Sequence, residues 1–182
     1  MGVNNGIEIG IGRPSCGFIK VGSDGILNYH SLAVASPVTI GCDGTETIIF
    51  GLSDGSICNS DGDLCAKGSG LVTSIISIDD GWASGDRNGR VLWGEEEIEL
   101  GREILSMGVA PNGVDLWVQT WEDKSSFLSI SPGGVYSQIF EHPDRIVVSD
   151  FKEGVLVFGD QLGRVFLVEE RYENRFDRED ME

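Results

Sequence analysis

The sequence predicts an all-β protein built from about five copies of a unit of four short strands. A hairpin pattern recurs along the chain: an apolar run, a polar turn that closes on Gly, and a second apolar run. Outside the last residues, no segment keeps the 3.6-residue apolar period of an amphipathic helix. The 26 Gly residues fall among the apolar runs and mark frequent turns.

The hairpins recur at a nearly regular interval. Their turns close on Gly25, Gly55, Gly89 and Gly163, with spacings of 30, 34 and 74 residues. Because the last spacing is about twice the others, a further copy is expected within it, and "DLWVQTWEDKSSFLSI" fits. The predicted hairpins are residues 19–29, 50–58, 83–93, 115–130 and 157–168.

The closing Gly has a physical reason to stand where it does. A short hairpin loop commonly ends with one residue at positive φ, where a Cβ atom is unfavourable. The turn-favouring residues Asp24, Asp54 and Asn88 precede three of these glycines. The fourth copy lacks the Gly, so a different loop is predicted at residues 122–125.

Two further segments follow each hairpin, a weaker strand and then a strongly apolar one. The weaker segments are residues 31–36, 63–66, 97–101 and 134–140. The stronger segments are residues 36–41, 71–78, 103–110 and 145–150, and residues 7–12 fit the same position ahead of the first hairpin. The repeating unit is therefore four strands in about 35 residues.

Four strands with a Gly-closed hairpin are typical of a β-propeller blade, so the predicted fold is a small five-bladed β-propeller of four-stranded blades. Within the third copy, "GDRNGRVLWG" resembles the second and third strands of a WD-repeat blade, with Trp93 near the family's Trp position. The family's Gly-His signature is missing, and the chain has only His30 and His142. The resemblance therefore implies a degenerate, distant WD-like propeller that lacks the family's Asp–His–Ser–Trp network. The alternative is a β-sandwich or jelly roll, which would not need regularly spaced hairpins.

The sequence predicts one propeller domain over residues 1–170 and an acidic C-terminal tail over residues 171–182. The fifth copy has no clear outer strand; the tail and the first residues of the chain are the candidates to supply it. If neither does, the last blade keeps an open edge, which is a route to self-association. The simpler alternative is an irregular outermost strand, which is common in propellers.

Composition narrows the classes of partner. The formal net charge is −17, from 13 basic and 30 acidic residues, which disfavours nucleic-acid binding. Solubility or adaptation to salt is the simpler explanation of so acidic a surface, and attraction of a protein partner with a basic surface is the alternative. The chain shows no apolar run of about 20 residues and no secretory pattern at its start, so we expect a cytoplasmic, intracellular protein without membrane contact. The four cysteines include no Cys-x-x-Cys pair and are expected to be reduced.

Sequence motifs for catalysis are missing. The chain has neither a Gly-x-Ser-x-Gly nucleophile motif nor a phosphate-binding loop, and the acidic turn at residues 59–63 has Gly70 where a calcium loop requires Glu. His30 and His142 lie in different repeats with no obvious carboxylate partner. The expected inner strands carry almost nothing ionisable near their centres. We therefore predict no enzyme, no catalytic residue, no metal site and no cofactor, a hydrolase being the least supported class.

The predicted function is a non-catalytic protein-interaction or scaffold module that presents loops on a rigid acidic disc. The alternative is a small carbohydrate-binding, lectin-like propeller. Packing in the core between blades is the simpler role for the aromatic candidates, and Trp121, which lies near a turn, is the best candidate for a surface contact. The candidate contact residues are Trp121, Trp117, Trp82, Asp86 and Asp123, with Tyr172 and Phe176 in the tail.

Overall fold

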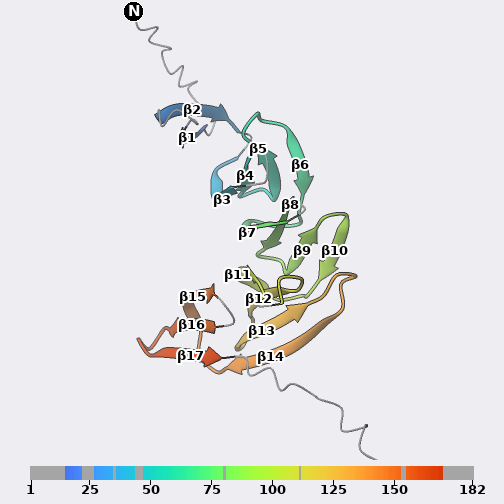
Figure 1. The fold of residues 1–182 in the computed structure, drawn as a ribbon, viewed down its shortest axis with the longest axis vertical. Helices are drawn as coiled ribbons and strands as arrows, with labels where there is room; N and C mark the ends of the chain where they lie inside the picture. The colour runs from blue at the N-terminus through green and yellow to red at the C-terminus, as the bar shows by residue number, and fades with distance from the viewer. Residues whose placement is uncertain are drawn as a thin grey trace, which may run out of the picture.

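The computed structural model describes residues 15–21, 27–34, 36–43, 47–79, 81–110, 112–152 and 155–169. Side chains are described for these residues from Val34 onward, except those of Asp43, Phe151, Lys152 and Glu169. Within these residues the secondary structure is entirely β, arranged as five antiparallel sheets in chain order (Figure 1). The five sheets lie one after another in chain order, so the structure is not a sandwich of two stacked sheets. The all-β propeller prediction is confirmed, whereas the number of blades stays a prediction.

The strands of each sheet follow one another in chain order. The first sheet holds β1 (Ser15–Val21) and β2 (Leu27–Ala33). The second holds β3 (Val38–Asp43), β4 (Ile48–Leu52), β5 (Ser56–Asn59) and β6 (Leu64–Lys67). The third holds β7 (Val72–Ile78), β8 (Gly81–Asp86), β9 (Arg90–Trp93) and β10 (Glu96–Glu99). The fourth holds β11 (Glu103–Val109), β12 (Leu116–Trp121), β13 (Ser125–Ile130) and β14 (Tyr136–His142). The last holds β15 (Ile146–Lys152), β16 (Val155–Asp160) and β17 (Val165–Glu169).

The sheets form an open arc. From the second sheet on, the first strands of successive sheets contact one another, β3 with β7, β7 with β11, and β11 with β15. The outer strands β6, β10 and β14 lie on the other side of the arc (Figure 1). The first and last sheets lie at opposite ends of the arc, so the described residues do not close a ring.

The predicted hairpins are confirmed as β1–β2, β4–β5, β8–β9, β12–β13 and β16–β17. Gly55, Gly89 and Gly163 have φ of 85°, 92° and 78°, as their turns require, while Gly25 lies outside the described residues. In the fourth copy Trp121 pairs with Ser125 across a turn without Gly, also as predicted.

The predicted outer strand at residues 31–36 is wrong. Residues 31–33 continue β2, because β1 is long enough to pair with them, from Ser31 opposite Gly17 to Ala33 opposite Ser15. The first sheet therefore has two strands among the described residues, and the last has three. Residues 7–12 and the tail at 171–182 lie outside the described residues, so no candidate for completing either sheet is placed.

Glycines on the second strands let successive sheets approach closely. A Cβ atom at Gly51 would lie 2.4 Å from Val72 Cγ1 of the next sheet. A Cβ atom at Gly85 would lie 2.5 Å from Ile104 Cγ2 and 2.8 Å from Met107 Sδ. The missing side chain thus makes room for apolar groups of the following inner strand, which belong to the buried cores between sheets.

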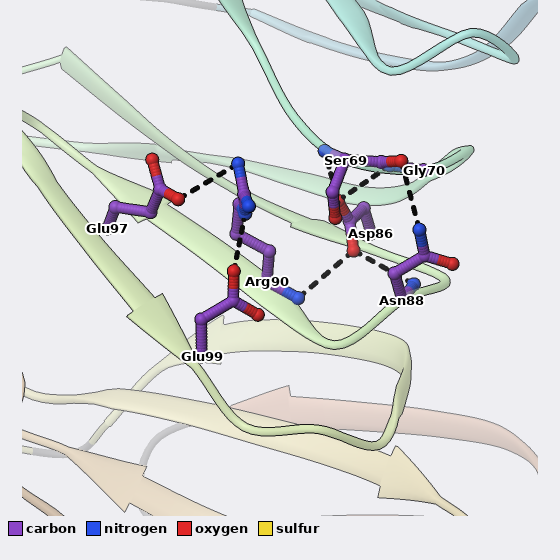
Figure 2. Close-up of polar contacts among 7 residues, drawn as sticks. All are labelled: Ser69, Gly70, Asp86, Asn88, Arg90, Glu97 and Glu99. Carbon is purple, nitrogen blue, oxygen red and sulfur yellow. Dashed lines mark hydrogen bonds and ion pairs between the residues drawn. The ribbon is translucent and has the colours of Figure 1, made fainter.

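A buried carboxylate joins the third sheet's hairpin turn to the connection that precedes the sheet (Figure 2). Asp86 Oδ2 accepts hydrogen bonds from Ser69 N and Oγ, both at 2.9 Å, and from Gly70 N at 3.0 Å. Its Oδ1 accepts from Asn88 N at 2.9 Å and Arg90 N at 3.0 Å. Burial by itself raises the pKa of Asp86, but hydrogen bonds from Arg90, Ser69 and Gly70 outweigh it and lower the pKa. Asp86 therefore holds the hairpin turn to the connection before the sheet, and we call this set of hydrogen bonds the Asp86 latch.

The glycine contact can be tested by adding one methyl group. We expect Gly85→Ala to destabilise the protein by about 1–3 kcal/mol, because Ile104 and Met107 must move apart to admit the new Cβ atom. Thermal unfolding measures the effect. The control is Gly41→Ala, where the nearest atom to the new Cβ is Phe50 Cδ1 at 3.2 Å. Equal melting temperatures for the two variants would contradict the packing argument.

The Asp86 latch should make stability depend on pH. Because the folded-state pKa of Asp86 is lowered, its contribution is full above the unfolded-state pKa of about 3.9 and is lost as pH falls through the folded-state value. We expect Asp86→Asn to cost about 1–3 kcal/mol at neutral pH, since an amide nitrogen cannot accept hydrogen bonds. The difference from the unsubstituted chain should shrink in strong acid.

Urea unfolding at several pH values measures this dependence. The control is Asp123→Asn, which neutralises an exposed carboxylate in the next hairpin turn and should change stability by less than about 0.5 kcal/mol. A pH-independent difference between Asp86→Asn and the unsubstituted chain would rule out ionisation as the source of the latch.

Candidate functional site

The arc of sheets has two ends that differ in how their loops are made. The turn end carries the hairpin turns that follow β4, β8, β12 and β16, together with the connections between successive sheets. The far end carries the turns between the first and second strands and between the third and fourth strands of each sheet. Because neighbouring strands within every sheet run antiparallel, each loop belongs to one end or the other.

Loops of the turn end are joined to one another by backbone hydrogen bonds. Gly68 N donates to Gly55 O and Leu100 N donates to Gly89 O, both at 2.8 Å. Gln161 N donates to Arg145 O at 2.9 Å, which joins the last hairpin turn to the connection before its own sheet. Backbone hydrogen bonds therefore hold neighbouring loops of the turn end together.

Every Lys and Arg whose side chain the structure describes lies at the turn end, and each forms an ion pair there or on an adjoining strand. Glu103 pairs with Arg87 at 3.2 Å and with Arg145 at 3.4 Å, linking three successive sheets. Arg145 also lies over the Trp121 ring, 5.4 Å from its centroid. The seven cations are Lys67, Arg87, Arg90, Arg102, Lys124, Arg145 and Arg164.

The far end carries acids without basic partners. Among the described residues, none of its six carboxylates forms an ion pair; Glu96, Asp63 and Asp115 accept neutral hydrogen bonds from Gly133 N, Asn59 and Asn112. Lys152 lies at this end of β15, but its side chain is outside the described set. The carboxylates are Asp61, Asp63, Asp79, Glu95, Glu96 and Asp115.

Exposed apolar side chains accompany these acids at the far end. Val135 and Tyr136, which follow the turn after β13, are 73% and 49% exposed, and Val114 in the turn before β12 is 56% exposed. Leu64, next to Asp63, is 62% exposed. The far end therefore combines carboxylates that have no ion pair among the described residues with exposed apolar side chains.

The structure does not bring the predicted contact residues together as one rim. Trp82 and Trp117 lie near the far ends of β8 and β12, whereas Trp121, Asp86 and Asp123 lie at the turn end. Trp117 and Asp86 are 4% and 2% exposed, so neither is available at the surface.

The remaining candidates differ in accessibility. Trp82 is half-buried and packs against the core between the second and third sheets. Trp121 is also half-buried, beneath the Arg145 guanidinium, while Asp123 is exposed in the turn beyond it. Tyr172 and Phe176 lie outside the described residues. Trp121 and Asp123 thus remain surface candidates, at the turn end.

A second buried carboxylate, Asp160, corrects one expectation from the sequence. His142 does have a carboxylate partner: its Nε2 lies 3.1 Å from Asp160 Oδ2, and both residues are buried. Phe166 packs edge-on against the His142 ring, with centroids 4.9 Å apart. This His–Asp pair therefore joins the end of the fourth sheet to the hairpin turn of the last sheet. The available signal in the sequence is the recurring Gly-Asp pair, in which Asp86 and Asp160 each stand three residues before the Gly that closes the turn.

His142, Asp144 and Asp160 lie close enough to share one cation. The Arg164 guanidinium already occupies that position, with Nη2 2.5 Å from both Asp144 Oδ2 and Asp160 Oδ2. Burial by itself raises the pKa of Asp160, but its hydrogen bonds with Arg164 and His142 reverse the effect and lower the pKa. The cluster is thus an internally neutralised latch, and its residues do not fit a metal ion while Arg164 is in place.

Other features of the described chain add no reactive group. Cys58 and Cys65 form no disulfide, and burial raises the pKa of both thiols. Cys58 faces Leu64 across β5 and β6 rather than Cys65. No helix among the described residues is long and apolar enough to cross a membrane.

Comparison with known proteins supports the fold. No protein-family model and no curated protein matches the chain. Among solved structures, the Cps50 (Swd1) β-propeller domain from Myceliophteria thermophila is 15% identical with a TM-score of 0.60, over 75% of this chain and 52% of that one. A chain in the crystal structure of a mitotic checkpoint complex is 13% identical with a TM-score of 0.59, over 76% and 52%.

An enzyme description also occurs among the similar structures. A protein from Bacteroides uniformis, provisionally described as a 6-phosphogluconolactonase, is 12% identical with a TM-score of 0.63, over 88% of this chain and 62% of that one. The chain therefore spans between about half and two thirds of the length of these three structures. At such identities the likeness establishes fold alone. The chain is a β-propeller repeat protein that is distantly similar to the WD-repeat propellers.

Proposed function

We propose that the chain is a non-catalytic protein-interaction module whose far end binds a partner with a basic surface. The observation that carries the proposal is the sorting of charge: the seven described cations pair with carboxylates at or near the turn end, and six far-end carboxylates have no ion pair among the described residues. Negative charge that is not neutralised within the protein attracts cationic groups and speeds their approach.

The neighbouring apolar groups give such a partner more than charge to bind. Exposed ion pairs contribute little each, so durable affinity needs desolvated apolar contact at the centre of an interface. Val114, Val135 and Tyr136 offer that contact on the fourth sheet, next to Glu96 and Asp115. A basic segment that carries apolar side chains is the partner that matches both properties.

The fold comparison is consistent with this class of function. One similar propeller occurs in the crystal structure of a mitotic checkpoint complex, an assembly of several proteins. The lactonase-like neighbour keeps an enzyme among the alternatives. The inner strands β7 and β11 carry only one ionisable residue, Glu103, which is ion-paired to Arg87 and Arg145. The inner strand β3 ends with Asp43, and β15 carries Asp150 and Lys152 near its end. Clustered ionisable groups on inner strands would be needed for hydrolysis.

The test compares two triple variants with the same change in net charge. One removes far-end acids, with Asp61→Asn, Asp79→Asn and Glu95→Gln. The matched control removes exposed turn-end acids, with Glu122→Gln, Asp123→Asn and Glu141→Gln. The probe is a library of lysine- and arginine-rich peptides that also contain apolar residues, with binding measured at low and at physiological salt.

We expect the far-end variant to bind selected peptides about 10-fold more weakly, since three charge pairs at about 0.5 kcal/mol each amount to one decade. The control variant should bind like the unsubstituted chain, and added salt should weaken binding to that chain. Equal loss in both variants would mean that only total charge matters and would refute the far-end site. Binding on a glycan array, with none to the peptides, would favour the carbohydrate-binding alternative.

A further inference from the structure

The outer strand of the third sheet, β10, runs alongside the β13–β14 hairpin of the fourth sheet. At the far end, Gly133 N donates to both carboxylate oxygens of Glu96, at 3.0 Å each. Two residues further along β10, Ile98 packs against Gly134, where a Cβ atom would stand 3.2 Å from Ile98 Cγ1. The two segments therefore meet closely at the start of β10, because the glycines facing it have no side chains.

Beyond these contacts the two segments enclose a pocket of about 100 Å³, lined by Leu100, Arg102, Leu128, Tyr136 and Gln138. Its most buried lining residues are apolar: Leu100 and Leu128 are 9% and 3% exposed and belong to the core between the third and fourth sheets. Tyr136 and Gln138 are exposed and lie two residues apart on one face of β14. The pocket thus has an apolar base and a rim in contact with solvent.

Strand length explains why the pocket exists. β14 extends over seven residues, Tyr136–His142, whereas β10 extends over four, Glu96–Glu99. After β10 the chain turns toward the third sheet's hairpin turn, where Leu100 N donates to Gly89 O at 2.8 Å. A Cβ atom at Gly89 would stand 2.5 Å from Arg102 N, so the connection packs tightly on that turn. This wall of the pocket is therefore held in place before any ligand binds, which lowers the cost of binding.

We propose that this pocket holds one aliphatic side chain of the basic partner, and that Glu96 binds a cationic side chain of the same segment. The inference rests on the proposed function, and it specifies which features of the partner the far end recognises. The exposed residues Val135 and Tyr136 connect the two positions, since they follow the turn that carries Gly133. Glu96 keeps acceptor capacity, because a carboxylate offers about four lone-pair sites and Gly133 supplies one donor.

The size and charge of the pocket select the kind of side chain. An apolar cavity of about 150 Å³ holds a benzene ring, so a smaller one suits leucine, isoleucine or valine better than tryptophan. Arg102 does not make the pocket an anion site, because its guanidinium pairs with Glu122 at 3.7 Å and donates to Ser126 Oγ at 3.4 Å. Burial of an aliphatic group on Leu100 and Leu128 is therefore the main contribution the pocket offers.

The course of β10 sets the spacing of the two recognised residues. Leu100 follows Glu96 by four residues, and an extended chain rises about 3.3 Å per residue, so the two positions lie about 13 Å apart. Residues four apart in an extended partner segment span this length and point to the same face. The predicted recognition element is an arginine or lysine four positions from a leucine, isoleucine or valine.

Nuclear magnetic resonance with the methyl-labelled full-length chain tests the proposal. The probe is a Gly- and Ser-rich peptide with two adjacent arginines and a leucine four positions from the nearer one, prepared with the leucine on either side. We expect the methyl signals of Leu100, Leu128 and Val135 to shift with one of the two orientations. The same peptide with alanine for leucine should shift Val135 alone and bind at least about 10-fold more weakly, because it lacks the buried aliphatic group.

Variants of the protein test the pocket from the other side. Gln138→Trp fills the pocket from its exposed rim, so it should weaken the leucine peptide about 10-fold and leave the alanine peptide unaffected. The matched control, Ser137→Trp, adds the same ring at the neighbouring exposed position on the opposite face of β14 and should bind like the unsubstituted chain. Glu96→Gln should weaken both peptides alike. Circular dichroism verifies that each variant is folded.

The outcomes separate this inference from the proposed function. Shifts at Val135 with none at Leu100 and Leu128, equal affinity for the two peptides, or equal weakening by Gln138→Trp and Ser137→Trp would overturn the pocket assignment and leave the proposed function standing. A peptide with arginine and leucine adjacent that binds as tightly would contradict the spacing. If neither peptide shifts any far-end signal, the pocket assignment and the proposed function both fail.

Discussion

The close approach of successive sheets at Gly51 and Gly85 is the constraint on which the described architecture depends. Without a Cβ atom at these positions, Val72 on one inner strand and Ile104 and Met107 on the next can reach the preceding sheet. The inner strands share a second feature, a β-bulge near their start, at Thr39 and Thr73 in the second and third sheets. Both Thr hydroxyls donate at 3.1 Å to the carbonyl of the corresponding glycine, which fixes the bulge against the second strand.

The loops at the two ends of the arc differ in what they contact. At the turn end, each hairpin turn meets the connection from the preceding sheet, so buried Asp86 and Asp160 and the paired Arg side chains satisfy polar groups there. At the far end, the turns are mostly closed within themselves, as in Gly62 N to Asn59 O and Gly134 N to Ser131 O. Side chains on those turns are therefore available for contacts with another molecule.

Two exposed surfaces of the described chain are physically distinct. The far end combines unpaired carboxylates with exposed apolar residues such as Val135, and it suits a partner that supplies positive charge. The outer face of the last sheet carries exposed apolar residues such as Val165 and Leu167 together with Asp150, which lies opposite Val157, and it contains the unfilled position at Gly159.

The sequence by itself determined the hairpins, because Gly55, Gly89 and Gly163 report a local demand for positive φ that neighbouring residues cannot change. It also indicated the repeat period and the distant WD-like character of the third copy. Tertiary structure decided what depends on contacts between separate repeats. It paired His142 with Asp160, 18 residues away, buried Trp117 and Asp86, and extended β2 through a predicted outer strand. The separation of ion-paired cations at the turn end from carboxylates without ion pairs at the far end could not be predicted from the sequence either. It depends on strand direction and sheet order, which the pattern of a single sequence does not determine.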